Sequence, residues 1–286
     1  MTQDRHESAI RCDVCANRCV LKPGATGACH ARTNDSGVVV PSGYGRITSI
    51  AVDPVEKKPL ARWQRGSKVL SVGGYGCNLH CPWCQNASIS QVGESDVPWR
   101  TVLPQELADL ATHLHMQDAR MVGVAYTYNE PLVCWEYVRD VAALVHEAGL
   151  SNVLVSAGCV SEHIVGSVAP LIDAANIDLK SMNAATYRML GGRLEVVQRT
   201  IELLAKTPTC HVEVTTLVVP GVNDSAEEMD ALAAWLANVD PRIVLHVSRF
   251  HPAWHKLDVG PTPVSKVYAL ADVARTHLEY VYTGNC

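Results

Sequence analysis

Three cysteines in one short stretch are the residues of this chain best suited to chemistry. Cys77, Cys81 and Cys84 stand in the sequence CNLHCPWCQN at the spacing C-x3-C-x2-C, directly after the glycine-rich run VGGYG. Thiolates bind zinc or iron–sulfur clusters. A structural zinc ion takes four ligands, usually from two C-x2-C turns, so three thiols in one loop favour a [4Fe–4S] cluster with one open iron. His80 lies inside the loop and is the alternative fourth ligand of a zinc site.

A second group of cysteines lies near the N-terminus. Cys12, Cys15, Cys19 and Cys29 have the spacing C-x2-C-x3-C-x9-C. Four thiols suffice either for a tetrahedral zinc site or for an auxiliary [4Fe–4S] cluster. The alternative is a cysteine-rich arm without metal, which would have few large apolar residues to keep it folded. We therefore expect a metal site here and leave zinc and cluster open.

The composition is that of an ordinary soluble protein, with 48% hydrophobic and 19% charged residues in 286. A net charge of -5 argues against a nucleic-acid surface, which relies on clustered Lys and Arg. No apolar run reaches the roughly 18 residues of a membrane span. The start, MTQDRHESAI, lacks the pattern of a secretory signal, so the eleven cysteines indicate metal binding rather than disulfides. We expect a cytoplasmic protein that binds neither nucleic acid nor membrane.

The elements that position these cysteines follow from the hydrophobic pattern. Residues 1–67 are rich in Gly, Pro and Cys and show no long amphipathic helix, whereas strand and helix patterns alternate from residue 68 onward. Strands are predicted at 68–74, 121–127, 152–158, 174–180, 211–219, 242–248 and 278–283. Helices are predicted at 104–116, 132–149, 194–206, 225–238 and 264–277.

This alternation predicts an α/β fold. Successive βα units imply a parallel sheet with helices outside, because parallel strands need crossover connections. About six units are too few for a closed eight-stranded barrel, so we expect an open, partial (β/α)6 barrel over 68–286 with a small metal-binding extension over 1–67. In such folds chemistry gathers at the carboxyl ends of the strands. The Cys77–Cys84 loop follows the first of these strands.

The pattern C-x3-C-x-aromatic-C, with Trp83 as the aromatic, resembles the signature of radical S-adenosylmethionine (SAM) enzymes. The resemblance implies that the open iron chelates SAM and that Trp83 lies at the cofactor site. One electron then cleaves SAM to methionine and a 5′-deoxyadenosyl radical, which abstracts hydrogen from the substrate. No catalytic side chain is expected, because the cofactor supplies the abstracting radical. The resemblance also implies an electron donor such as flavodoxin or ferredoxin.

Later segments fall where this superfamily carries its SAM contacts, one at each strand end. Asn129 and Glu130 in YTYNEP take the last two places of the glycine-glycine-glutamate motif, although NEP also suits a helix start. Lys180 in IDLK and His251 in FHP match positions near SAM in glycyl-radical-enzyme activases. Ser156 stands where relatives have asparagine, so a polar contact is either lost there or supplied by Ser156.

Over nearly its whole length the chain is similar to the pyruvate formate-lyase-activating-enzyme-like group known as AmmeMemoRadiSam radical SAM proteins. The shared marks are the N-terminal cysteines, DPxEKKPL, GCNLxCxxCQN, TYNEP, DLK, EVTTLVVPGVND and HxSRFHP. The resemblance implies hydrogen abstraction from a protein or peptide. Two alternatives remain: a radical SAM enzyme that acts on a small molecule, and a non-catalytic scaffold in which both cysteine groups are structural.

Overall fold

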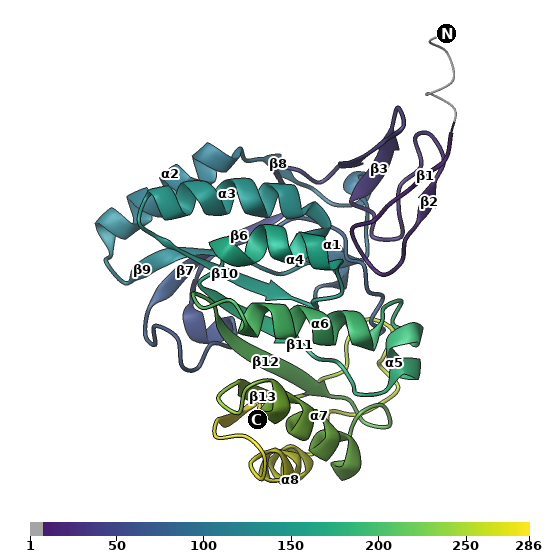
Figure 1. Ribbon diagram of the computed structural model, residues 1–286, viewed down its shortest axis with the longest axis vertical. Helices are drawn as coiled ribbons and strands as arrows, with labels where there is room; N and C mark the ends of the chain where they lie inside the picture. Colours follow the sequence, from purple (N-terminus) through teal and green to yellow (C-terminus); the bar gives the residue numbers. More distant parts are fainter. Residues whose placement is uncertain (1–7) are drawn as a thin grey trace.

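The computed structural model describes residues 8–286; the first seven residues, part of the stretch inspected for a secretory signal, lie outside the described residues. Its centre is one eight-stranded sheet (Figure 1). The strands of this sheet are β6 (Ser49–Pro54), β7 (Lys68–Gly73), β9 (Met121–Tyr126), β10 (Ser151–Ser156), β11 (Ala174–Asp178), β12 (His211–Val218), β13 (Val244–Arg249) and β14 (Val281–Gly284).

The sheet follows the order β14-β13-β12-β11-β10-β9-β7-β6, so strands that succeed one another in the chain are neighbours in space. Each pair from β7 to β14 is parallel, and only β6 runs antiparallel, to β7. The edge strands β6 and β14 do not pair with each other. This is the open (β/α)6 partial barrel that the alternation predicts.

Helices follow the strands and lie in front of the sheet in Figure 1. Parallel strands such as β9 and β12 are buried on both faces, as covered parallel sheets require. The helices are α1 (Ala87–Ser90), α2 (Pro104–Gln117), α3 (Trp135–Glu147), α4 (Glu162–Val168), α5 (Ala184–Met189), α6 (Leu194–Ala205), α7 (Ala226–Val239) and α8 (Val264–Ala274). The short 3-10 turns are η1 (Val55–Lys57), η2 (Glu94–Asp96), η3 (Pro131–Cys134) and η4 (Ala169–Leu171).

The main differences from the predicted elements have local causes. The helix predicted at 132–149 begins as η3 and becomes α-helical only at Trp135, because Pro131 and the Glu130 carboxylate, which accepts from the Leu132 amide, set the first turn. The short helices α4 and α5 were not predicted. Strand β6 lies in the main sheet, so the sheet includes residues from the stretch 1–67 that we assigned to the extension.

The N-terminal extension is a set of short strands beyond the carboxyl end of β10 (Figure 1). They pair as two antiparallel hairpins, and a third pair joins the extension to the segment before α2. The strands are β1 (Ile10–Arg11) with β2 (Val20–Leu21), β3 (Arg32–Asp35) with β4 (Val38–Pro41), and β5 (Arg46–Ile47) with β8 (Arg100–Thr101). We call residues 8–48 the N-terminal module.

Residues 55–67, which we call the plug segment, cross the inner side of the sheet between β6 and β7. The Asn176 side chain on β11 donates to the Pro59 carbonyl at 2.8 Å. The Glu213 carboxylate on β12 accepts from the Ala61 and Arg62 amides at 2.9 and 2.8 Å. These hydrogen bonds therefore join the plug segment to β11 and β12, beneath the cavity described below.

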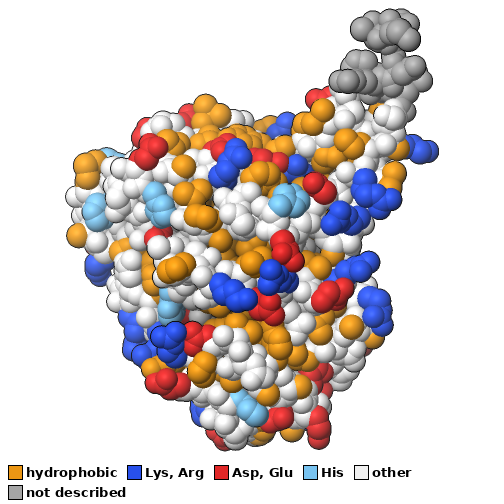
Figure 2. Space-filling view, viewed as in Figure 1, with side chains coloured by type: hydrophobic (Ala, Val, Ile, Leu, Met, Phe, Trp, Pro, Cys, Tyr) orange, Lys and Arg blue, Asp and Glu red, His pale blue; other side chains and the backbone are white. Residues whose placement is uncertain are grey.

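The visible surface carries no block of one charge. On the face in Figure 2, acidic and basic side chains are interspersed over the helices. Within residues 8–286 no helix has both the length and the apolar character that a bilayer crossing requires.

Candidate active site

A cavity of about 750 Å³ lies on the inner side of the sheet, at the carboxyl ends of the strands. Its wall is formed by the cysteine loop (residues 74–86), the ends of β9 to β13, and the plug segment. It brings together eight residues that the sequence analysis named: Cys77, Cys81, Cys84, Trp83, Asn129, Glu130, Ser156 and Lys180.

The cysteine loop is shaped by backbone contacts. Gly76 adopts a φ of +82°, which favours glycine, and its amide donates to the Ile89 carbonyl at 2.9 Å. The Leu79 amide lies 3.4 Å from the Cys77 sulfur, and the Ser90 hydroxyl lies 3.1 Å from the Cys84 sulfur. Hydrogen bonds to sulfur tune a bound iron–sulfur cluster. The Leu79 amide supplies one such donor, and the Ser90 hydroxyl can supply a second.

Burial sets the protonation of these thiols. It raises the pKa of Cys77 well above its usual range. It also raises the pKa of Cys81 to about 11, although the nearby Lys180 ammonium opposes this rise. Both thiols are therefore protonated at neutral pH, and a metal bound here would release their protons.

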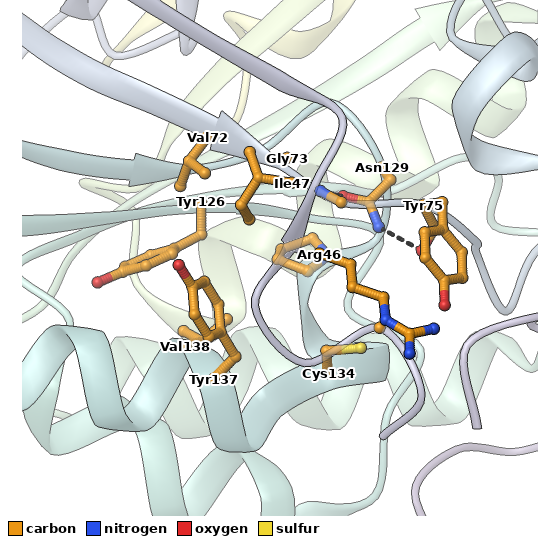
Figure 3. Close-up of a pocket in the computed structure, with 13 residues that line it drawn as sticks. Arg46, Ile47, Val72, Gly73, Tyr75, Tyr126, Asn129, Cys134, Tyr137 and Val138 are labelled. Atoms are coloured by element: carbon orange, nitrogen blue, oxygen red, sulfur yellow. Dashed lines mark hydrogen bonds between the residues drawn. The ribbon is translucent and has the colours of Figure 1, made fainter. Parts of the chain in front are cut away.

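Asn129 holds the cysteine loop in place. Its Oδ1 accepts from the Gly74 amide at 3.0 Å, and its Nδ2 donates to the Tyr75 and Gly76 carbonyls, both at 3.0 Å. Figure 3 shows this side chain beside Tyr75 at the edge of a small, mainly apolar pocket of about 30 Å³. The amide expected to contact SAM is thus engaged by the loop backbone.

Glu130 joins the end of β9 to the end of β10. Its Oε1 accepts from the Leu132 amide at 3.0 Å and from the Ser156 hydroxyl at 2.8 Å, and its Oε2 accepts from the Ala157 amide at 2.8 Å. Burial raises the pKa of Glu130, and these hydrogen bonds oppose the rise. Ser156 Oγ also accepts from the Gly158 amide at 2.9 Å. Both side chains line the cavity and shape its wall.

Lys180 supplies a cation in the cavity wall. Its Nζ lies 2.7 Å from an Asp178 carboxylate oxygen. Burial alone would lower the pKa of Lys180, but the neighbouring Asp178 carboxylate outweighs burial and raises it. The ammonium is therefore charged next to Cys81 and can pair with an anionic group of a ligand.

His251, expected near SAM, is not among the residues of the cavity wall. It follows the end of β13, is exposed, and its Nε2 lies 3.5 Å from the Asn285 carbonyl oxygen. The residue placed inside is His246, which shares one face of β13 with Ser248. The signal that could have found it is the two-residue period of a strand, since His246 and Ser248 alternate with apolar residues.

Two groups of polar side chains behind the cavity wall were also missed, and each contacts a wall residue, Tyr128 or His246. Lys58 Nζ lies 2.8 Å from an Asp53 carboxylate oxygen and 4.7 Å from the centre of the Tyr128 ring, whose hydroxyl donates to Asp53 at 2.7 Å. His246 Nε2 lies 2.5 Å from a Glu213 carboxylate oxygen. The first group belongs to the motif DPxEKKPL, which we used only as a family mark.

The N-terminal cysteines gather in the N-terminal module. Cys12, Cys15 and Cys29 are buried, Cys19 is half-buried, and all four are free thiols. Within residues 8–286, no three His, Cys, Asp or Glu side chains stand as closely as the ligands of a single metal ion.

Comparison with known proteins finds one matching family and several similar proteins. The family model described as Radical SAM superfamily matches residues 71–235. An uncharacterized protein of Methanocaldococcus jannaschii is 35% identical over 282 residues, which are 98% of this chain and 82% of that protein. The benzylsuccinate synthase activating enzyme of Thauera aromatica is 26% identical over 68% of this chain. The indoleacetate decarboxylase activating enzyme of Tractidigestivibacter scatoligenes is 24% identical over 54% of this chain. The matches span only 58% and 53% of these two enzymes.

Solved structures share the fold at low identity. QueE from Escherichia coli aligns with a TM-score of 0.53 at 15% identity, over 83% of this chain and 92% of QueE. Streptococcus suis SuiB bound to S-adenosylmethionine aligns with a TM-score of 0.56 at 12% identity, over 76% of this chain and 52% of SuiB. The family match covers more than half of the 286 residues. This chain is therefore an enzyme of the radical SAM superfamily, whose members use a [4Fe–4S] cluster and SAM.

Proposed function

We propose that Cys77, Cys81 and Cys84 hold the [4Fe–4S] cluster and that SAM lies beside it in the cavity. The observation that carries this proposal is the shared wall, in which the three thiols stand with Lys180 and Trp83. The alternative fourth ligand for zinc, His80, is not among the residues of that wall.

The protein groups around this site have distinct tasks. A bound cluster with one open iron supplies the chelation of SAM and the electron for its cleavage. Lys180 offers its ammonium to the SAM carboxylate, and Trp83 covers the cofactor. Asn129 fixes the loop through three hydrogen bonds, while Glu130 and Ser156 set the position of the neighbouring strand ends.

For the substrate we propose hydrogen abstraction from a protein or peptide, with a flavodoxin or ferredoxin as electron donor. The similarity to activating enzymes supports this substrate class. A small polar molecule is the second candidate, because Glu56, Lys57 and His246 line the part of the wall formed by the plug segment and β13.

Anaerobic reconstitution tests the cofactor assignment. We expect the wild type to bind about four irons at the cysteine loop and to form 5′-deoxyadenosine from SAM and dithionite. The variant Cys77→Ala, Cys81→Ala, Cys84→Ala should lose both, whereas Cys210→Ala, a half-buried thiol outside the cavity wall, should retain both. If the wild type bound zinc and did not cleave SAM, the proposal would be refuted.

Deuterium transfer tests the substrate class. The loaded enzyme would be incubated with SAM and an extract of perdeuterated cells, divided by dialysis into macromolecules and small molecules. Deuterated 5′-deoxyadenosine from the macromolecular fraction supports a protein or peptide substrate. Deuterium transfer from the small-molecule fraction alone overturns that substrate and supports the second candidate.

A further inference from the structure

We propose that Cys12, Cys15, Cys19 and Cys29 bind an iron–sulfur cluster, whose thiolate ligands stand further apart than those of a single metal ion, and that this cluster braces the cysteine loop. The evidence for the metal site comes from residues of the N-terminal module alone. The evidence for the brace comes from the contacts of the module with the rest of the chain. That the braced loop carries a cluster rests on the proposed function.

The four thiols come from two tight turns that face each other. The β1–β2 hairpin closes the first turn, with the Cys12 amide donating to the Cys19 carbonyl at 2.8 Å. In the second turn the His30 amide donates to the Gly27 carbonyl at 2.9 Å. A Cβ on Gly27 would lie 3.7 Å from the Cys19 sulfur and 3.8 Å from the Cys29 sulfur, so thiols of both turns flank this glycine.

The module has too small an apolar core to hold these turns by itself. Within residues 8–48 the buried apolar side chains other than cysteine are Val14, Leu21, Ala31 and Ile47. Small folds with so little core are usually stabilised by disulfides or a structural metal. The cysteines of the module are free thiols, so metal is the stabiliser that their chemistry offers.

The turns of the module contact the cysteine loop directly. The Asn17 side chain, between Cys15 and Cys19, donates to the Asn78 carbonyl at 2.9 Å. Gly76 packs so closely on the Cys29 backbone that a Cβ there would collide with the Cys29 carbonyl oxygen. Two residues of the loop, on either side of Cys77, are thus held by the segments that carry the proposed ligands.

The same turns contact the segment after β10. Cys15 forms an antiparallel bridge with Val160, and the Ser161 amide donates to the Val14 carbonyl at 2.9 Å. The Asn78 side chain completes the connection by donating to the Cys159 carbonyl at 2.7 Å. Metal binding that orders the module therefore also orders the cysteine loop and the segment after β10, because the free energy of metal binding contributes to the free energy of folding.

The metal site is tested in the variant Cys77→Ala, Cys81→Ala, Cys84→Ala, which removes the proposed catalytic cluster. Zinc, iron and sulfide would be measured after anaerobic purification and reconstitution. We expect one cluster per chain, with about four irons and sulfide. Adding Cys12→Ser and Cys15→Ser should remove it, and adding Cys210→Ser and Cys286→Ser instead should not. Absence of iron from the first variant, with or without zinc, overturns the site, whether or not the wild type cleaves SAM.

The brace is tested with Asn17→Ala, which leaves all four thiols in place. Hydrogen exchange would be followed in peptides that contain the Gly76 and His80 amides, which donate to Ile89 and Leu190. Loss of one hydrogen bond should speed their exchange about fivefold, with unchanged exchange over β12 and unchanged metal in the N-terminal module. Asn238→Ala on α7 is the control. Unchanged exchange of the loop in Asn17→Ala would overturn the brace and leave the proposed function untouched.

Discussion

At the scale of single residues, the sequence shows which side chains meet but not which of their atoms are already engaged. Strand-end motifs singled out Asn129, Glu130, Ser156 and Lys180, and the structure places all four in one cavity wall. Hydrogen bonds to the backbone then occupy the Asn129 amide and both Glu130 oxygens. Such bonds depend on the exact path of the loop, which no spacing rule encodes. His251 stayed outside the wall because the chain leaves β13 at Arg249, before the motif begins.

Asn129→Ala should loosen the cysteine loop. Three buried or half-buried hydrogen bonds are lost, so the variant should be destabilised by about 2–3 kcal/mol and should lose most of its iron during gel filtration. Urea unfolding and iron analysis measure the two effects. Asn86→Ala is the matched control, because Asn86 also lines the cavity but donates one bond, to the Tyr128 carbonyl. Equal iron retention in the two variants would refute the holding role of Asn129.

At the scale of elements, the plug segment closes the inner side of the sheet. Sequence patterns did not predict it, because it contains only the short turn η1 and its contacts are made with strands more than a hundred residues away. The charged motif DPxEKKPL (residues 53–60) overlaps the start of the plug segment, and its second lysine is buried. The Lys58 side chain is 4% exposed and is held between the Asp53 carboxylate and the Tyr128 ring.

Lys58→Met should destabilise the protein strongly. It leaves the Asp53 carboxylate, 11% exposed, without its nearest cation, and breaking such a buried pair costs about 3 kcal/mol or more. Lys57→Met is the matched control, since Lys57 is 69% exposed and 3.3 Å from the same carboxylate; an exposed partner contributes about 1 kcal/mol or less. Urea unfolding of both variants checks the difference. Similar losses in the two would mean that Lys58 is not the essential partner.

At the scale of the whole molecule, the alternating pattern was enough to predict the open barrel but not how the N-terminal segments pack on it. Buried parallel strands and amphipathic helices carry their own periodic signals. The pairing of β6 with β7 and the bridge between Cys15 and Val160 join distant segments, and neither shows in a local pattern. The sequence therefore predicts the frame and the cysteine loop, whereas the module and the plug segment that enclose the loop require coordinates.

Glu213 on β12 connects the plug segment with β13, and its titration should be visible in the free energy of unfolding of the whole protein. Its buried carboxylate accepts from the Ala61 and Arg62 amides and from His211 and His246. Burial would raise its pKa, but these hydrogen bonds outweigh burial and lower the pKa to about 2. The unfolded value is about 4.3. The carboxylate therefore stabilises the fold above that pH, by about 3 kcal/mol, and this contribution is lost as the pH falls from about 5 to 2.

Glu213→Gln removes that contribution at every pH. Urea unfolding at pH 7, 5, 4 and 3 should show the variant to be weaker than the wild type by about 3 kcal/mol at pH 7, with the difference shrinking as the pH falls. Glu147→Gln, at an exposed position on α3, should change the free energy of unfolding by about 0.5 kcal/mol or less. If the wild-type and Glu213→Gln curves stayed parallel down to pH 3, the acid-sensitive connection would lie elsewhere, and the plug segment would depend on ion pairs such as Asp53 with Lys58.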